Sequence, residues 1–470
     1  MKTRLEKDSL GTKEVPADAL YGIQTLRAVE NFPVSGWRFP RSFIRALSLI
    51  KKCAAQVNMD LGFLDKKVGE AVRQSAAEAA EGKWDDQFPV DIFQTGSGTS
   101  TNMNANEVIA SRANEILGGQ RGAKSPVHPN DHVNRGQSSN DVIPTAIHVA
   151  ALESLVKELV PALEELQAAL AEKATAFDGI LKIGRTHLQD AVPMRLGQEF
   201  GGYASQVAHG VQRVKNCVPH LAELALGGTA VGTGLNANPA FIEGVIKQLG
   251  TETGLSFVGA PSRFEALAGR DACVETSGAL KTVAVSLLKI SNDLRWLSSG
   301  PRCGIGEIEL PSLQPGSSIM PGKVNPVIPE AVAMVCAQVI GADVAITVGG
   351  QSGNFELNVM KPMIAHNLLS SISIVANVSR LLADRCVKGI KANKAIAEGF
   401  IENSLAMCTA LAPKVGYDKA AEIAKEAYAT GKTVRQVALA KKILSEKELE
   451  TLLDARAMTE PGMTLDGAGG

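Results

Sequence analysis

The sequence predicts an all-α protein built as a bundle of long helices, and three observations lead to that prediction. Hydrophobic residues make up 45% of the 470 residues and aromatic residues only 4%, so aliphatic side chains must form the core. Such a core suits helices better than a β-sandwich. Long runs without glycine carry apolar residues at steps of three and four, and two segments are apolar on nearly every side.

Charge and cysteine usage narrow the class of protein. The chain has 48 Lys and Arg against 49 Asp and Glu, which argues against a nucleic-acid-binding face or a polybasic membrane anchor. Its 7 cysteines are scattered and form no C-x-x-C pair, so neither a disulfide framework nor a zinc site is expected. The first residues are polar and carry acids, unlike a signal or transit peptide. We expect a soluble, cytoplasmic protein with no membrane and no nucleic acid among its partners.

The chain divides into three predicted domains. Residues 1–140 are mixed, mainly helical, and contain two polar stretches at 94–104 and 128–134. Residues 141–395 are dominated by long helical patterns, and residues 396–470 are amphipathic and charged, as in a small helical domain.

The central domain begins with a helical run from Ala146 to Phe177 that contains no glycine and that Pro161 is expected to interrupt. Its apolar face consists of Leu152, Leu155, Val156, Leu159, Leu163, Leu166 and Leu170. Further along, residues 283–290 and 331–342 are apolar nearly all round. A helix without a solvent face must be surrounded by others, and one chain covers only some such helices, so we expect an oligomeric bundle.

The stretch from Pro315 to Pro326 is a predicted loop, because three prolines and two glycines in twelve residues exclude a helix interior or a central strand. It differs from a P-loop in the spacing of its glycines and in Val324, which follows Lys323 where a Ser or Thr is required. The Gly96–Thr101 stretch lacks the third glycine of a dinucleotide fingerprint. We therefore expect no nucleotide cofactor. Read by itself, the loop could be a rigid turn with a solvated lysine.

The same polar chemistry recurs at Gln137–Asp141 and Gly184–Asp190. Hydroxyls, amides, one histidine and one ammonium are the groups that hold a small dicarboxylate by hydrogen bonds.

At this point the sequence resembles the fumarase/aspartase superfamily and, within it, the class II fumarases. Gly316–Pro326 matches the superfamily motif G-S-S-x-M-P-x-K-x-N-P at every fixed position. Five further blocks occur in the family's order: Gly96–Thr99, Asn102–Asn104, His128–Asp131, Gln137–Asp141 and Arg185–Asp190. The resemblance covers essentially the whole chain. It implies an all-α, three-domain fold whose central long helices form a multi-helix core in a homotetramer, with each active site shared between subunits.

The resemblance also implies an activity, the reversible hydration of fumarate to L-malate, a step of the tricarboxylic acid cycle. Removing a proton from the carbon next to a carboxylate gives an unstable aci-carboxylate, so the site needs a base and fixed donors. In the family's pattern Ser317 is the base, acting as an alkoxide, while Lys323 and Asn325 hold the carboxylate on which charge accumulates. His187 activates water and Glu330 orients its imidazole. Some accounts of the family give the proton-abstracting role to this histidine instead.

Further positions are carried over from the matching blocks. Those implied to bind substrate are Ser97, Gly98, Thr99, Ser138, Ser139, Asn140, Thr186, Ser318 and Val324. Those that match a second dicarboxylate-binding segment are His128, Pro129, Asn130 and Asp131, for which a structural role is an equal alternative. No metal is expected, because His128 and His132 have metalloprotease-like spacing without the adjacent glutamate.

Two alternatives remain at the level of sequence. Aspartate ammonia-lyase shares the fold and the base, and the segments 14–22, 83–88 and 325–330 are typical of it. Ser139, Ser97 and His128 stand where aspartases usually carry Thr, Ala and Asn, and these substrate-contacting differences favour fumarase. A catalytically silent structural relative is the second alternative, against which the intact motif residues argue.

Overall fold

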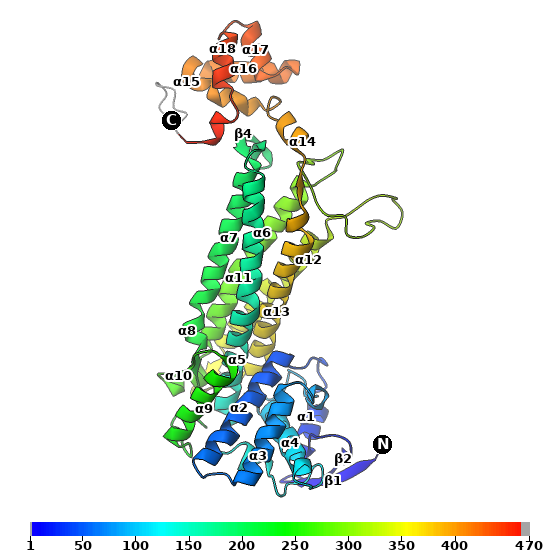
Figure 1. Ribbon diagram of the computed structural model, residues 1–470, viewed down its shortest axis with the longest axis vertical. Coiled ribbons are helices and arrows are strands. Elements are labelled where there is room, and N and C mark those ends of the chain that lie inside the picture. Colours follow the sequence, from blue (N-terminus) through cyan, green and yellow to red (C-terminus); the bar gives the residue numbers. More distant parts are fainter. Residues whose placement is uncertain (1, 462–470) are drawn as a thin grey trace. The chain divides into compact units, whose positions relative to one another are not determined.

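The computed structural model describes residues 2–461 and consists mainly of helices (Figure 1). The predicted all-α class is confirmed, because the strands within residues 2–461 form only two-stranded sheets. The antiparallel pairs are β1 (Thr3–Asp8) with β2 (Gly11–Pro16), β3 (Leu181–Thr186) with β4 (Gln189–Arg195), β7 (Ile308–Glu309) with β10 (Lys391–Ala392), and β8 (Gly353–Asn354) with β9 (Leu357–Asn358). The parallel pair is β5 (Glu223–Leu224) with β6 (Val258–Gly259).

The chain forms two compact units. The first comprises Met1–Pro161, Gly210–Ala284 and Val335–Asn377, and the second comprises Ala162–His209, Val285–Met334 and Val378–Gly470. The predicted boundaries near residues 140 and 395 remain predictions, and the end of the third predicted domain, residues 462–470, lies outside the described residues.

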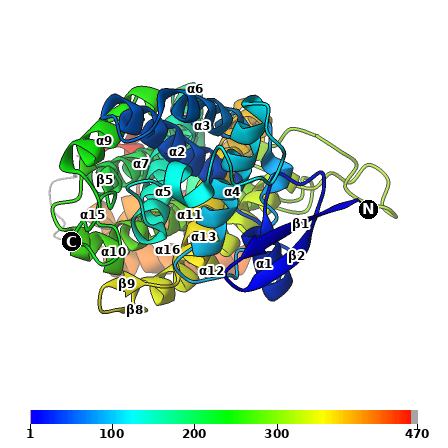
Figure 2. The same ribbon diagram turned by 90° about the horizontal axis from the view of Figure 1, so that it is seen from below.

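In the first unit, shorter helices pack around α2, which lies beside α4 and α5 (Figure 2). The helices that lie wholly in this unit are α1 (Ile23–Asn31), α2 (Arg41–Asp60), α3 (Lys66–Ala80), α4 (Thr99–Ile116), α5 (Ser139–Ser154), α8 (Val218–Leu221), α9 (Pro239–Thr253) and α10 (Arg263–Ala268). Their packing buries a core from α2, α3 and α4 that includes Val72, Ala76 and Ile109. This core holds the C-terminal half of α4, through Ile109, Ala110 and Ala113, against α2 and α3.

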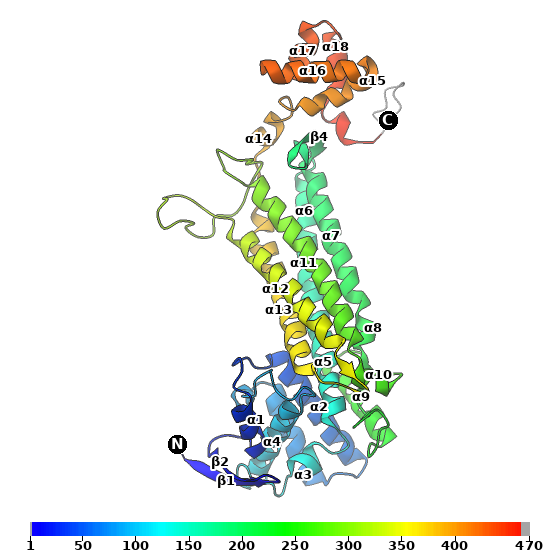
Figure 3. The ribbon, with the colours of Figure 1, turned by 180° about the vertical axis from the view of Figure 1, so that it is seen from behind.

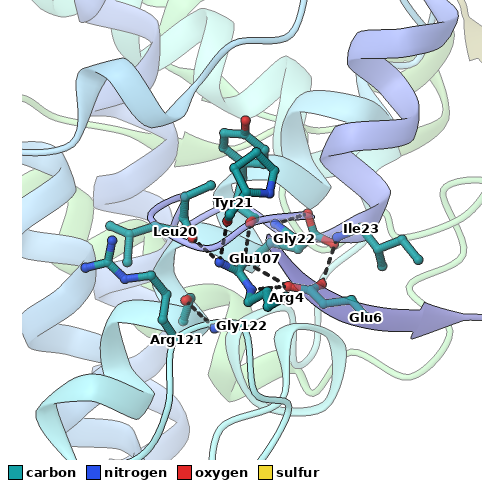
Figure 4. A network of polar contacts seen from close by, with 12 residues as sticks. Arg4, Glu6, Leu20, Tyr21, Gly22, Ile23, Glu107, Arg121 and Gly122 are labelled. Atoms are coloured by element: carbon teal, nitrogen blue, oxygen red, sulfur yellow. Dashed lines mark hydrogen bonds and ion pairs between the residues drawn. The ribbon is translucent and has the colours of Figure 1, made fainter. Parts of the chain in front are cut away.

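A polar network ties the N-terminal strands to α1 and α4 (Figure 4). The Glu107 carboxylate of α4 accepts hydrogen bonds from the N–H groups of Gly22, Gln24 and Thr25 at 2.9–3.0 Å, so a buried acid caps the start of α1. Arg4 donates to the carbonyls of Pro16, Ala17, Ala19 and Tyr21, which precede that helix. Gly22 lies between them, where a Cβ would come within 2.8 Å of the Glu6 carboxylate and 2.9 Å of the Glu107 carboxylate, so a larger residue would displace these side chains.

The long helices are α6 (Val160–Ala176), α7 (Leu196–Asn216), α11 (Asp271–Leu297), α12 (Val327–Gly350) and α13 (Lys361–Arg385). Of the predicted apolar face on residues 146–177, every leucine is buried and Val156 is half-buried. The interruption predicted at Pro161 is observed as a change of helix type. A π-helical turn, Leu155–Leu159, separates α5 from α6, and Pro161, which has no N–H, is the second residue of α6.

The second unit ends in a cluster of small helices (Figure 3). They are α14 (Lys394–Gly399), α15 (Ala412–Val415), α16 (Tyr417–Thr430), α17 (Val434–Ala440) and α18 (Glu446–Leu452). Their buried side chains, including Ile423, Val437 and Leu449, share a core with Ile183 of β3. The amphipathic pattern read from the sequence of this region is therefore that of packed helices, and its core anchors the β3–β4 hairpin.

Helix α12 is the most apolar helix, and within residues 2–461 it is the one whose length and composition alone would suit a membrane span. Its Asp343 is buried and accepts from the Lys281 ammonium at 2.6 Å and the Ser277 hydroxyl at 2.7 Å, both on α11. Met334 and Val344 are 68% and 60% exposed, so the single chain leaves an apolar side of α12 uncovered.

Candidate active site

The predicted site residues fall into two groups, one in each compact unit. The first unit contains the residues between Ser97 and Asn140, and the second contains Thr186, His187 and the loop that leads to Glu330.

In the second unit, residues 315–326 form the predicted loop, which ends where α12 begins. The Gly316 N–H donates to the Lys323 carbonyl at 2.8 Å, and the Asn325 amide donates to the Gly316 carbonyl at 2.6 Å. A Cβ on Gly316 would lie 2.6 Å from the Lys323 carbonyl oxygen, so this position requires glycine. These contacts close the loop at its base.

The Ser317 hydroxyl lies within this closed loop. Its Oγ accepts hydrogen bonds from the N–H groups of Met320 at 2.9 Å and Ile319 at 3.2 Å. Backbone N–H groups aimed at an oxygen stabilise negative charge on it, as in an oxyanion hole. The structure therefore supplies at Ser317 the donors that an alkoxide needs.

The other predicted residues of the loop are more open. The residues exposed in the single chain are Ser318, Lys323 and Val324. Asn325 is half-buried, and its side-chain amide donates one hydrogen bond to the Gly316 carbonyl within the loop. Glu330 lies in the first turn of α12, as the sequence predicts, where its charge suits the helix dipole.

His187 occupies the tip of the β3–β4 hairpin. Thr186 pairs with Gln189, so His187 and Leu188 form a two-residue turn, and both have positive φ angles of 58° and 59°. Such turns normally use Asn and Gly, because a Cβ is crowded in the left-handed region. Both side chains are exposed. A strained, exposed histidine is typical of a functional position. Within the described residues His187 and Glu330 share no hydrogen bond.

A cluster of buried charges lies at the base of this hairpin, and sequence reasoning did not identify it. The Arg185 guanidinium donates to Glu307 at 2.9 Å, and the Lys182 ammonium lies 3.0 Å from Glu199 and 3.3 Å from Glu307. Lys182 is 2% exposed and Glu307 is fully buried. The cluster fixes the strand that leads to Thr186 and His187.

In the first unit, the predicted substrate-binding residues gather at the N-termini of α4 and α5. Gly98 precedes α4 with a φ of 80°, and a Cβ there would lie 2.9 Å from Ile143 of α5. Ser97 and Thr99 share a hydrogen bond of 2.8 Å between their hydroxyls. Ser138 caps α5 in a capping box with Asp141.

Buried amides join these two helix starts. Asn102 of α4 donates to the Ser139 hydroxyl at 3.1 Å and to the Asn134 side chain at 3.2 Å. Two helix N-termini with hydroxyls at their ends present partial positive charge and hydrogen-bond donors together, which suits a carboxylate. Asn140 donates its side-chain amide to the Ala230 carbonyl at 2.8 Å.

Buried ionisable groups surround the same place. Asp141 accepts from the N–H groups of Gly227 and Thr229 at 3.0 Å, and burial raises its pKa. The Lys51 ammonium donates to Asn134 and Gln137 at 2.9 Å, and burial lowers its pKa to about 7. The sequence does not reveal the two buried lysines of this region, Lys51 and Lys361, because an isolated lysine in a helical pattern is typical of the protein surface.

The segment His128–Asp131 borders a cleft of about 530 Å³. The cleft is lined by Asn58, Phe63, Asn130, Asp131, Asn134, Arg135, Gly136, Gln137, Asn236, Asn238 and Phe241. The His128 Nδ1 accepts the N–H groups of Asn130 and Asp131 at 3.3 Å and so caps a π-helical turn, Pro129–Val133. Residues 2–461 contain no cluster of three or more His, Cys, Asp or Glu side chains suited to a metal ion.

Comparison with known proteins places the chain in a family. The lyase family model matches residues 11–341, and the fumarase C C-terminus model matches residues 407–460. The class II fumarate hydratase of Halobacterium salinarum is 57% identical over 460 residues, covering 98% of each chain. That of Nitrosomonas europaea is 53% identical over 457 residues, covering 97% of this chain and 99% of the relative.

A solved structure agrees with these relatives. The class II fumarase of Schistosoma mansoni superimposes with a TM-score of 0.95 at 40% identity, covering 98% of this chain and all of that one. Because both family models, the full-length relatives and the superimposed fold agree with the motif geometry, the chain belongs to the class II fumarate hydratase family of lyases.

Proposed function

We propose that the chain catalyses the reversible addition of water across the double bond of fumarate to give L-malate. The observation that supports this most directly is the environment of Ser317, whose hydroxyl accepts two loop N–H groups in the same loop that carries Lys323 and Asn325. Membership in the class II fumarate hydratase family agrees with the proposal.

In the direction of malate dehydration, the Ser317 alkoxide takes the proton from C3. The electron pair of the broken C–H bond moves into the neighbouring carboxylate, giving the aci-carboxylate, which Lys323 and Asn325 stabilise by charge and hydrogen bonding. The pair then returns to form the double bond as the C2–O bond breaks. Hydration follows the same steps in reverse, with Ser317 returning its proton to C3.

His187 is proposed to carry out the second proton transfer, which is the one to or from the water oxygen. In dehydration its imidazolium protonates the departing hydroxide so that water leaves, and in hydration its neutral imidazole takes a proton from the attacking water. Glu330 is proposed to stabilise the imidazolium in the assembled enzyme. The positive φ of His187, in a turn between paired residues, supports a functional reason for its place.

The substrate carboxylates are proposed to bind where α4 and α5 begin. Ser97, Thr99, Ser138, Ser139 and Asn140 provide hydroxyl and amide donors there, next to two helix N-termini. Gly98, Thr186, Ser318 and Val324 complete the proposed substrate contacts. His128, Pro129, Asn130 and Asp131 are proposed as a second dicarboxylate site beside the 530 Å³ cleft.

We also propose that the enzyme is a homotetramer whose active sites take residues from more than one subunit. The support is the apolar side of α12, where Met334 and Val344 are open, together with Trp296 and Val285 of α11, which are 53% and 54% exposed. Large exposed side chains of this kind on long helices indicate an interface between chains. The seven cysteines are free, which fits a reducing compartment such as the cytoplasm.

The test of the activity is a purified-protein assay that follows the absorbance of the fumarate double bond. We expect absorbance to fall with fumarate alone and to rise with L-malate alone. A fall that requires ammonium would instead support aspartate ammonia-lyase, and no change under either condition would support a silent structural relative.

A further inference from the structure

Lys361 is a buried lysine that joins the two segments at which the proposed substrate carboxylate binds. It is the first residue of α13 and is fully buried. Its backbone N–H donates to the Gly96 carbonyl at 3.1 Å, and its ammonium donates to the Asn140 carbonyl at 3.0 Å. One residue therefore holds both the segment before α4 and the first turn of α5.

The contact with Asn140 has a specific cause in the sequence of α5. A helical carbonyl is normally paired with the N–H four residues later, and for Asn140 that residue is Pro144, which has none. The carbonyl would be left unpaired, and the Lys361 ammonium occupies its place. A neutral donor would satisfy this carbonyl equally well, so the hydrogen bond alone does not explain why the donor is a cation.

The hydrogen bond from the Lys361 N–H to the Gly96 carbonyl, at 3.1 Å, also depends on a specific residue type. A Cβ on Gly96 would lie 1.7 Å from the Val359 carbonyl oxygen, so only glycine allows the two backbones to approach. Ser97 follows directly, and its hydroxyl is bonded to Thr99 at 2.8 Å. The position of these hydroxyls is therefore set by the chain that leads into Lys361.

The charge of Lys361 is unfavourable for the protein by itself. Burial lowers its pKa to about 7, and nearby Arg270 lowers it further, whereas Asp141 raises it. A cation beside the N-terminus of α5 also opposes the helix dipole. An anion bound at the same helix start would reverse both effects, because it would be attracted by the dipole and by the ammonium.

We propose that Lys361 is a positioning residue for the substrate carboxylate: it holds the starts of α4 and α5 at one spacing, and its buried charge favours a dianionic ligand there. The inference rests on the proposed function, because it uses the proposed carboxylate contacts at Ser97, Thr99 and Asn140.

The test compares Lys361→Met, which removes donor and charge, with Lys361→Gln, which keeps an amide donor without the charge. We expect Lys361→Met to raise KM for fumarate at least about tenfold while kcat changes less than about threefold, as for a lost charged hydrogen bond that acts on binding. Lys361→Gln should raise KM by an intermediate factor. Lys52→Met is the matched control, since Lys52 pairs with Glu252 at 2.7 Å in the same unit and contacts neither helix start.

Calorimetric binding of succinate, which cannot be hydrated, separates this inference from the proposed function. Weaker succinate binding by Lys361→Met and Lys361→Gln than by the wild type and Lys52→Met supports the inference even if fumarate is not turned over. Unchanged KM and unchanged succinate affinity in folded Lys361→Gln overturn it while leaving the activity intact. A wild-type protein that neither turns over fumarate nor binds succinate overturns both.

Discussion

Arg185 lies two residues before His187, the histidine at the tip of the β3–β4 hairpin, and its guanidinium donates to the fully buried carboxylate of Glu307 at 2.9 Å. Lys182, three residues earlier in the same strand, lies 3.3 Å from the same carboxylate. One buried acid thus holds two points of the strand that carries His187.

Arg185→Met should lower both stability and turnover. The Glu307 carboxylate would keep only Lys182 as a cationic partner, and breaking a buried pair costs about 3–5 kcal/mol. The hairpin tip would lose its support, so kcat should fall more than KM rises. Urea unfolding and steady-state kinetics measure the two effects. Arg435→Met is the control, because its pair with Glu402 is more exposed and should contribute less than about 1 kcal/mol.

Ser317→Ala should lower kcat by at least about a thousandfold, because it removes the proposed base and leaves the loop N–H groups without their acceptor. Circular dichroism and sedimentation should remain those of the wild type, since the loop is closed by Gly316, Lys323 and Asn325. Ser312→Ala, on an exposed residue before the loop, should turn over normally. Near-normal turnover by Ser317→Ala would remove this serine as the base.

His187→Asn should impair turnover while affecting succinate affinity less. Asn tolerates the positive φ at this position, so the turn should persist without the imidazole. The measurement is kcat beside calorimetric binding of succinate. Leu188→Asn, at the other positive-φ position of the same turn, is the matched control and should keep its activity. Equal rates for His187→Asn and the wild type would contradict the acid–base assignment.

Lys51 should make the protein more stable as pH rises above neutrality. Its pKa is lowered from 10.5 to about 7 by burial, so between these values the unfolded chain binds an additional proton. The free energy of unfolding should then increase with pH by up to about 1.4 kcal/mol per unit. Urea unfolding at pH 7 and 9, at one protein concentration, should show a smaller increase for Lys51→Met than for Lys52→Met. Equal increases would show that Lys51 stays charged when buried.

Val344→Glu should divide the proposed tetramer into smaller species and abolish turnover, because it places a charge on the open apolar side of α12. Analytical ultracentrifugation and the fumarate assay test this. Tyr428→Glu is the control, since Tyr428 is 80% exposed on α16 of the C-terminal helices. A fully active Val344→Glu monomer would refute the shared active site.

Much of the fold was accessible from the sequence because helical periodicity and apolar content are local signals. The leucine face of residues 146–177, the loop before α12 and the acid in its first turn are all observed. The sequence marks the segment around His187 only as polar and does not predict its hairpin, because a two-residue turn without glycine carries no local signature.

The supporting residues of the site could not be predicted in this way. Lys361 acts on a carbonyl that Pro144 leaves unpaired, and the two positions are far apart in sequence. Glu307 likewise meets Lys182 and Arg185 only through the fold. Such pairs form only through tertiary contacts, and residues that are far apart in the chain have no periodic pattern from which one sequence could predict their contact.

The Glu107 cap has a practical consequence for handling the protein. In the first strand, Arg4 donates to the Tyr21 carbonyl and Glu6 accepts the Ile23 N–H, so trimming residues 2–8 would remove contacts that hold the start of α1 beside Glu107. A purification tag fused ahead of this strand should therefore be joined by a flexible spacer and cleaved before affinities are compared.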